Sequence, residues 1–183
     1  MNKPNAQPGD ICIMLVPADF QGAQGRDWQL NLQQKYGGSV TDKLHLMVQR
    51  FTPGEEEDIE EIEAFLKNLA AELEPIPILI HEIFTASSGF RGKIILKGAT
   101  PSTPEITAVS ERVNREIENM SCKGHYSFIP RFVTLLEGLQ ENIGDIREHI
   151  DPVHLFQAEG LLTSIISKPG SWEIRKIFLR RSE

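Results

Sequence analysis

Apolar positions along the chain follow two spacings, which predict strands in some segments and helices in others. Residues 11–16 form an unbroken apolar run that stops at Pro17, as expected for a buried strand. Residues 55–73 predict a helix, because apolar side chains recur there every three or four residues and share one face. That face consists of Ile59, Ile62, Leu66, Leu69 and Leu73.

The remaining segments continue this alternation of strands and helices. Residues 100–105 predict a helix start, with a Ser or Thr cap and a proline in the first turn. Further helices are expected at 20–35, before two glycines, and at 139–149. Strands are expected at 43–51, at 128–136, in a hairpin over 76–97, and in a closing pair over 161–167 and 172–180.

A similar order of elements occurs twice along the chain. In each half a strand and a helix lead to a distinctive strand tetrad, near residue 45 and again near residue 131. This coarse duplication predicts an α+β fold with two lobes, each an antiparallel sheet flanked by helices. Residues 1–9, which are polar and contain two prolines, are expected to be a flexible leader, and residues 10–183 a single bilobal domain.

The charge balance narrows the classes of partner. The 183 residues include 19 Lys and Arg against 26 Asp and Glu, a net charge of −7. Duplex DNA is therefore not an expected partner, because proteins that bind it present a basic face, but a small basic cleft stays possible. No signal peptide or membrane-length apolar run is seen, which predicts a cytoplasmic protein without a membrane partner. Cys12 and Cys122 match no metal-binding spacing and are interpreted as reduced core residues.

Two short segments combine strand-forming residues with groups that can bind anions or transfer protons. In residues 44–51 (LHLMVQRF), His45 and Met47 share one face, because strand residues two apart point the same way. An imidazole has an ordinary pKa near 6.5, so it can take or give a proton at neutral pH. In residues 128–136 (FIPRFVTLL), Arg131 and Thr134 follow a proline.

In these segments and their order the chain resembles the two-histidine phosphoesterase superfamily, which contains bacterial RNA 2′,3′-cyclic phosphodiesterases once called 2′-5′ RNA ligases. The resemblance runs from about Ile11 to Leu179 and includes HLMVQRF, the hairpin ending at 96–98, the PSTPEI helix start and the closing LLTSIISKPGSWEIRKIFL. It implies two lobes around a central cleft, with one His-x-Thr motif in each. It also implies that one histidine acts as general base, the other as general acid, and the threonines hold phosphate, with no metal or organic cofactor.

This sequence departs from the superfamily pattern in both motifs. The first motif keeps His45 but has Met47 in the threonine position, and a thioether donates no hydrogen bond. In the second motif, alignment on the proline puts Arg131 in the histidine position, whereas alignment on Thr134 puts Phe132 there. Arginine stays protonated and cannot act as an acid or base, but it can clamp a phosphate.

The candidate site therefore consists of His45 as the catalytic residue and Arg131, Thr134 and Met47 as substrate-binding residues. The second motif has no histidine, and one of the four other histidines could replace it in the site. The alternative is that all four are surface or structural residues. These four are His81, His125, His149 and His154. Four cations are either extra positive charge at the cleft mouth or solvated surface residues: Arg50, Arg91, Lys93 and Lys97.

Three functions remain open at this point. The first is a metal-independent hydrolase of 2′,3′-cyclic phosphates or RNA ends. Its activity would be weak or lost, because each acid–base group is worth about 10²–10⁴-fold in rate. The alternative is a non-catalytic module that binds a nucleotide or RNA end through phosphate in the same cleft. The third is a protein-interaction role with a vestigial cleft. No cofactor is expected, and the sequence leaves the substrate and the oligomeric state open.

Overall fold

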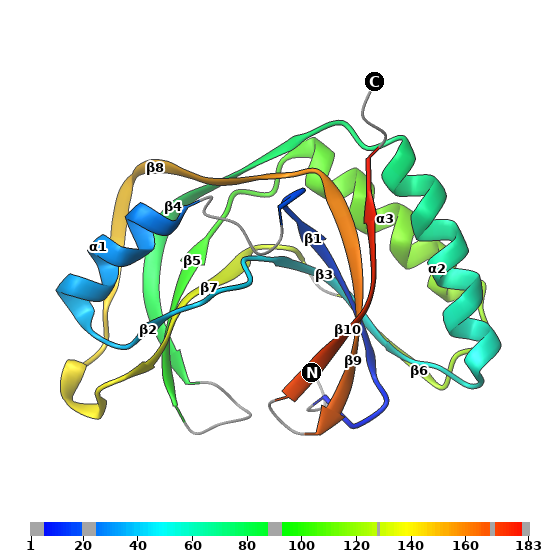
Figure 1. Ribbon diagram of the computed structural model, residues 1–183, viewed down its shortest axis with the longest axis horizontal. Coiled ribbons are helices and arrows are strands. Elements are labelled where there is room, and N and C mark those ends of the chain that lie inside the picture. Colours follow the sequence, from blue (N-terminus) through cyan, green and yellow to red (C-terminus); the bar gives the residue numbers. More distant parts are fainter. Residues whose placement is uncertain (1–5, 20–24, 88–92, 128, 169–170, 181–183) are drawn as a thin grey trace.

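Two five-stranded sheets form the frame of the protein in a computed structural model that describes residues 6–19, 25–87, 93–127, 129–168 and 171–180 (Figure 1). The first sheet has the strand order β10-β9-β1-β3-β6 and the second β2-β7-β5-β4-β8. All of the paired strands are antiparallel. The strands are β1 Ile11–Val16, β2 Ser39–Val40, β3 Leu46–Thr52, β4 Ile76–Ser87, β5 Ile94–Ala99, β6 Gly124–Ser127, β7 Phe132–Leu139, β8 Arg147–Ala158, β9 Gly160–Lys168 and β10 Ser171–Leu179.

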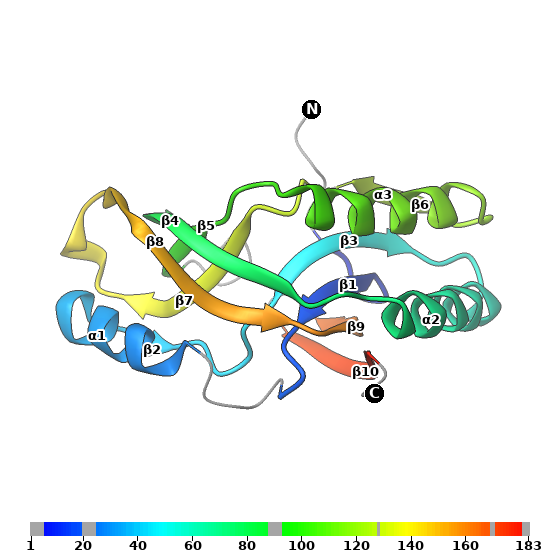
Figure 2. The same ribbon diagram turned by 90° about the horizontal axis from the view of Figure 1, so that it is seen from above.

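Three α-helices pack against these sheets in the described part of the chain. α2 (Glu56–Ala71) contacts β9 and β10 and α3 (Pro104–Glu118) contacts β3 and β6, so both cover the first sheet (Figures 1 and 2). α1 (Arg26–Tyr36) contacts β2 and β7 of the second sheet. The helix start expected at 100–105 is confirmed, because Thr103 Oγ1 accepts a hydrogen bond from the Ile106 N–H at 3.3 Å. The predicted α+β class with two antiparallel lobes is confirmed.

The helix predicted at 139–149 is wrong. This segment holds only the end of β7, a 3₁₀ turn at Glu141–Ile143 and the start of β8. β8 is a 12-residue strand with alternating exposure whose edge position lets polar residues dominate it. Its sequence therefore carries few apolar residues, and the apolar pattern gave no strand signal there. Gly144 at φ 74° marks the turn that leads into it.

One large apolar cluster joins the two lobes. The core cluster contains Ile13 and Leu46 from the first sheet together with Ile78 and Val133 from the second. β8 pairs with β4 of the second sheet, and after Glu159 the chain continues into β9 of the first. One cluster of buried side chains therefore spans both sheets.

Irregular pairing between β1 and β3 decides which residues of β3 face away from the core. Met14 pairs with Met47 and Cys12 pairs with Arg50, but the register shifts between Ile13 and Met14. Three positions therefore separate Met47 from Arg50 on the same face, where strict alternation would need two or four. This bulge turns Arg50, rather than Gln49, toward the face that carries Met47.

The start of the described chain packs against the end of the first sheet. Ala6 is buried, the Gly9 N–H donates to the Ile166 carbonyl at 2.8 Å, and the Gln7 N–H donates to Asp10 Oδ2 at 2.9 Å. Residues 1–5 of the expected leader lie outside the described residues.

Candidate functional site

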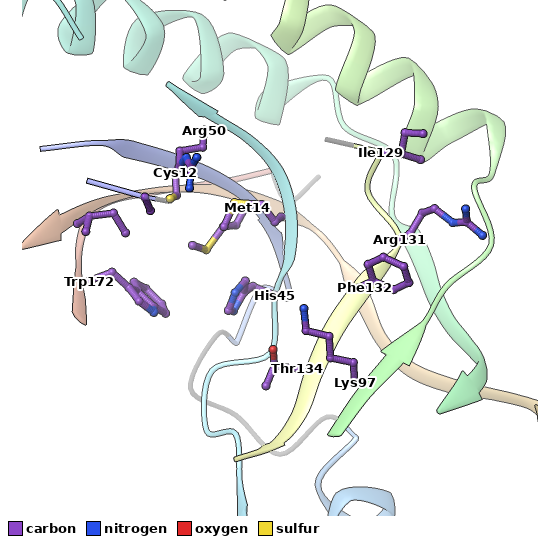
Figure 3. Close-up of a pocket in the computed structure, with 13 residues that line it drawn as sticks. Cys12, Met14, His45, Arg50, Lys97, Ile129, Arg131, Phe132, Thr134 and Trp172 are labelled. Atoms are coloured by element: carbon purple, nitrogen blue, oxygen red, sulfur yellow. The ribbon is translucent and has the colours of Figure 1, made fainter. Parts of the chain in front are cut away.

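A cavity of about 400 Å³ lies between the two sheets, and it collects most of the candidate site residues (Figure 3). The first sheet lines it with Cys12 and Met14 of β1, Ile166 of β9, Trp172 of β10, and His45, Met47 and Arg50 at or within β3. The second sheet lines it with Lys97 of β5 and with Phe132 and Thr134 of β7. Ala6, Ile129 and Arg131 complete the wall.

His45 lies immediately before β3, and its orientation is fixed at one ring nitrogen. Nδ1 is 2.8 Å from the Lys43 carbonyl oxygen, which accepts a hydrogen bond, so the proton of the neutral ring lies on Nδ1. The ring also makes an edge contact with Trp172, with centroids 5.5 Å apart. Burial lowers the pKa of His45 below its ordinary value, while the bond to Lys43 and the charge of Glu137 oppose that change. A neutral ring held in this way presents Nε2 as a proton acceptor.

On the first sheet, the cavity wall that contains His45 also carries methionine and cysteine side chains and one ion-paired arginine. Met47 lines the cavity beside Met14, its partner across β1 and β3, so the threonine position holds an apolar wall residue. Arg50 is buried, with Nε 3.5 Å from Asp10 Oδ2, which offsets its charge. Burial raises the pKa of the Cys12 thiol to about 12, so this cavity cysteine stays protonated.

On the second sheet, strand alternation determines which side chains of β7 face the cavity. Val133 and Leu135 are fully buried in the core, whereas Phe132 is 46% exposed and Thr134 is half-buried. Phe132 and Thr134 thus share the face that lines the cavity. β7 therefore presents a phenyl ring and a hydroxyl group to the cavity.

Arg131 lies just before β7 and belongs to the rim of the cavity. Its guanidinium is 5.9 Å from the ring centre of Phe132 and points away from His45 (Figure 3). Its backbone carbonyl accepts a hydrogen bond from the Thr100 N–H at 2.7 Å, which ties this segment to the end of β5.

Trp172 is a cavity residue that the sequence did not single out, whereas Lys97 was expected only as extra positive charge at the cleft mouth or as a solvated surface residue. Lys97 pairs with Thr134 across β5 and β7, and its charged end points into the cavity, toward the side of His45 (Figure 3). Burial lowers the pKa of Lys97 below its ordinary value. One feature of the sequence could have indicated Lys97: it directly follows the apolar residues Ile94, Ile95 and Leu96 in the same strand. A lysine within an otherwise buried strand is rare unless its charged end reaches a polar cavity or the solvent.

The other candidates lie elsewhere. None of the four remaining histidines lines the described cavity: His125, His149 and His154 are exposed, and His81 is half-buried on β4. Lys93 is exposed and Arg91 lies outside the described residues. Within the ranges that the structure describes, no cluster of three or more His, Cys, Asp or Glu could hold a metal ion, and none of the helices has the length and apolar character of a membrane span.

Charge in the cavity is opposite in sign to that of the protein. The described lining contains an imidazole and three cations but no carboxylate, in a chain of net charge −7. Because Asp10 offsets Arg50, the cations left without a carboxylate contact in the described structure are Lys97 and Arg131. Such a cavity favours an anionic ligand.

Comparison with solved structures places this architecture among known folds. TT0787 of Thermus thermophilus superimposes with a TM-score of 0.59 at 15% identity, over 95% of this chain and 99% of that one. E. coli LigT complexed with 3′-AMP gives 0.55 at 12% identity, over 97% and 100%. The chain has the LigT fold. A structure described as a phosphoesterase gives 0.55 at 13% identity, over 96% and 100%.

The LigT fold is what the resemblance to the two-histidine phosphoesterases implied, so that expectation is confirmed for the fold. E. coli LigT has also been solved with phosphate and with NADP⁺. No family model and no curated protein matches the chain by sequence.

Proposed function

We propose that this protein is a divergent two-histidine phosphoesterase-like protein whose cavity binds the phosphate of a nucleotide or RNA end. Its hydrolysis of 2′,3′-cyclic phosphates is weak or lost. The observation that carries the proposal is the cavity lining, which combines His45, Thr134 and Lys97 from two sheets with no carboxylate among the described residues. The complexes of LigT with 3′-AMP and phosphate support this ligand class, because they belong to a protein of the same fold.

The chemistry of the two motifs explains why we propose phosphate binding together with weak or lost hydrolysis. Binding needs hydrogen-bond donors and positive charge, which His45, Lys97 and the Thr134 hydroxyl supply. Two-histidine hydrolysis also needs a proton donor on the second lobe, and Phe132 in that position has none. Losing one of two acid–base groups costs about 10²–10⁴-fold in rate.

Calorimetric titration with 3′-AMP, with adenosine as the phosphate-free comparison, tests the binding function. We expect 3′-AMP to bind and adenosine to bind at least tenfold more weakly. Thr134→Val keeps the side-chain shape but removes the hydroxyl, so it should weaken 3′-AMP binding about fivefold, since a hydrogen bond contributes about 1 kcal/mol. Thr107→Val, at an exposed position of α3, is the matched control. Equal affinity for adenosine and 3′-AMP would refute the phosphate-binding function.

Catalysis by His45 is the second candidate, and the geometry of its ring favours it. With Nδ1 donating to the Lys43 carbonyl, Nε2 is free to take a proton from an attacking water. Turnover of 2′,3′-cyclic AMP that His45→Ala abolishes would establish this activity. Binding of 3′-AMP without such turnover would leave the protein as a non-catalytic nucleotide-binding module.

A further inference from the structure

Lys97 is the one residue of the second sheet's described cavity lining that can release a proton within an accessible pH range. Phe132 has no ionisable group, the Thr134 hydroxyl is a very weak acid, and Arg131 stays protonated. A lysine ammonium can serve as a proton donor when it is partly desolvated. The side chain that could replace the second histidine therefore lies one strand away from the second motif, on β5.

The position of Lys97 suits a proton donor. It is the cross-strand partner of Thr134, so its side chain leaves the sheet beside the hydroxyl that we assign to phosphate. Its Nζ lies 5.9 Å from the ring centre of Phe132 and points into the cavity on the opposite wall from His45 (Figure 3). A phosphate held between the two sheets would thus have an imidazole on one side and an ammonium on the other.

We propose that Lys97 is the general acid of a residual cyclic phosphodiesterase activity, in the role that the absent second histidine plays in the superfamily. His45 Nε2 takes a proton from water as the water oxygen forms a bond to phosphorus. The bond from phosphorus to one ribose oxygen of the cyclic phosphate breaks, and that oxygen takes a proton from Lys97 Nζ. The products are a phosphate monoester and a free hydroxyl. This inference rests on the proposed phosphate binding in the same cavity.

The surroundings of Lys97 define how its protonation should respond to pH. Its backbone partners on either side, Phe84 on β4 and Thr134 on β7, do not titrate near neutral pH. The titratable or charged groups that face the same cavity are His45, Arg50, Arg131 and Cys12. None of these groups is a carboxylate whose negative charge would stabilise the protonated form of Lys97. Burial therefore lowers the pKa of the Lys97 ammonium group without an opposing charge.

The experiment measures turnover of 2′,3′-cyclic AMP and binding of 3′-AMP in parallel, for the wild type, Lys97→Arg and Lys97→Gln. Lys97→Arg keeps the positive charge but cannot give up a proton. We expect it to bind 3′-AMP within about threefold of the wild type and to lose about 10²-fold or more in kcat. Lys97→Gln should lose both binding and turnover. Lys93→Gln, at an exposed lysine immediately before β5, should change neither.

The pH profile separates a proton donor from a residue that only attracts phosphate. The wild-type rate should fall at high pH as Lys97 loses its proton, and this alkaline limb should be missing in Lys97→Arg. Full activity with an unchanged alkaline limb in Lys97→Arg would overturn the acid role. Binding of 3′-AMP with no measurable wild-type turnover would also overturn it while leaving the proposed function intact. Absence of 3′-AMP binding would contradict the proposed function itself.

Discussion

At the scale of single residues, the contacts of His45 hold its ring in one orientation at the cavity wall. Its ring is anchored through Nδ1 to the Lys43 carbonyl and through its edge to Trp172, so its orientation does not depend on a bound ligand. Met47 supplies no hydrogen bond beside it. The first lobe thus presents a positioned proton acceptor to the cavity, and the neighbouring Met47 adds no hydroxyl beside it.

The lowered pKa of His45 predicts a specific contribution to acid sensitivity. In the unfolded chain the imidazole titrates near 6.5, whereas burial lowers its pKa in the folded protein. As pH falls below about 6.5, the unfolded state binds a proton that the folded state resists, so the free energy of unfolding decreases. Urea unfolding at pH 7.5 and pH 5.5 should show a smaller loss of stability in His45→Gln than in the wild type.

The control for this measurement is a substitution of an exposed histidine. His125→Gln, at an exposed position on β6, should lose as much stability between the two pH values as the wild type does. An equal acid loss in His45→Gln and the wild type would contradict the assigned burial effect.

Gly98, the residue after Lys97, allows the side chains of Ile80 and Leu135 to pack closely against the backbone of β5. A Cβ at this position would lie 2.8 Å from Ile80 Cγ2 and 3.1 Å from Leu135 Cδ1, both in the core between β4, β5 and β7. Gly98→Ala should therefore lower the free energy of unfolding by about 1–3 kcal/mol, as expected for overpacking. Urea denaturation measures this, and a variant as stable as the wild type would show that the core relaxes without cost.

At the scale of elements, a buried carboxylate fixes α2 on the first sheet. Glu63 of α2 accepts hydrogen bonds from the Thr163 hydroxyl at 2.9 Å and from Arg175 Nε at 3.2 Å, and Lys176 Nζ lies 2.5 Å from it. Burial alone would raise the pKa of Glu63, but the bonds from Lys176, Thr163 and Arg175 outweigh it and lower the pKa. One side chain therefore connects α2 with both β9 and β10.

Glu63→Ala should destabilise the protein by about 1–3 kcal/mol, the usual range for losing hydrogen bonds to a charged group. The loss stays moderate because Lys176 is largely exposed and can turn to water. The midpoint of urea unfolding measures the effect. Glu61→Ala, at an exposed position of the same helix, should shift it by less than about 0.5 kcal/mol. Equal shifts for the two variants would mean that the Glu63 contacts contribute nothing.

Most elements could be predicted from the sequence because each buries a regular apolar pattern. α2, α3 and β1 have such patterns, and their expected positions agree with the structure to within a few residues. β8 could not be predicted, because an exposed edge strand needs few apolar residues. The site follows the same logic: alternation grouped His45 with Met47, but the bulge that brings Arg50 into the cavity depends on how β3 pairs with β1. The pairing of Lys97 with Thr134 likewise depends on strand register, which a single sequence does not state.

At the scale of the whole molecule, the shared apolar cluster predicts that the two lobes unfold as one unit. The same apolar cluster contains residues of both sheets, and β8 leads directly from one sheet into the other. The cavity is bounded by both sheets, so its shape depends on their relative position. Ligand binding and global stability should for this reason be linked: a ligand that binds only the folded state stabilises both lobes together.

The two tryptophans allow a direct test of this coupling, since they lie in different lobes. Trp28 is in α1 against the second sheet, and Trp172 is in β10 of the first. In Trp28→Phe the remaining fluorescence reports the first lobe, and in Trp172→Phe it reports the second. Within each variant, the urea transition seen by fluorescence should coincide with that seen by far-ultraviolet circular dichroism, as two-state unfolding requires. Separate transitions in either variant would show that one lobe can persist without the other, and the cavity would then be an interface between two independently folding units.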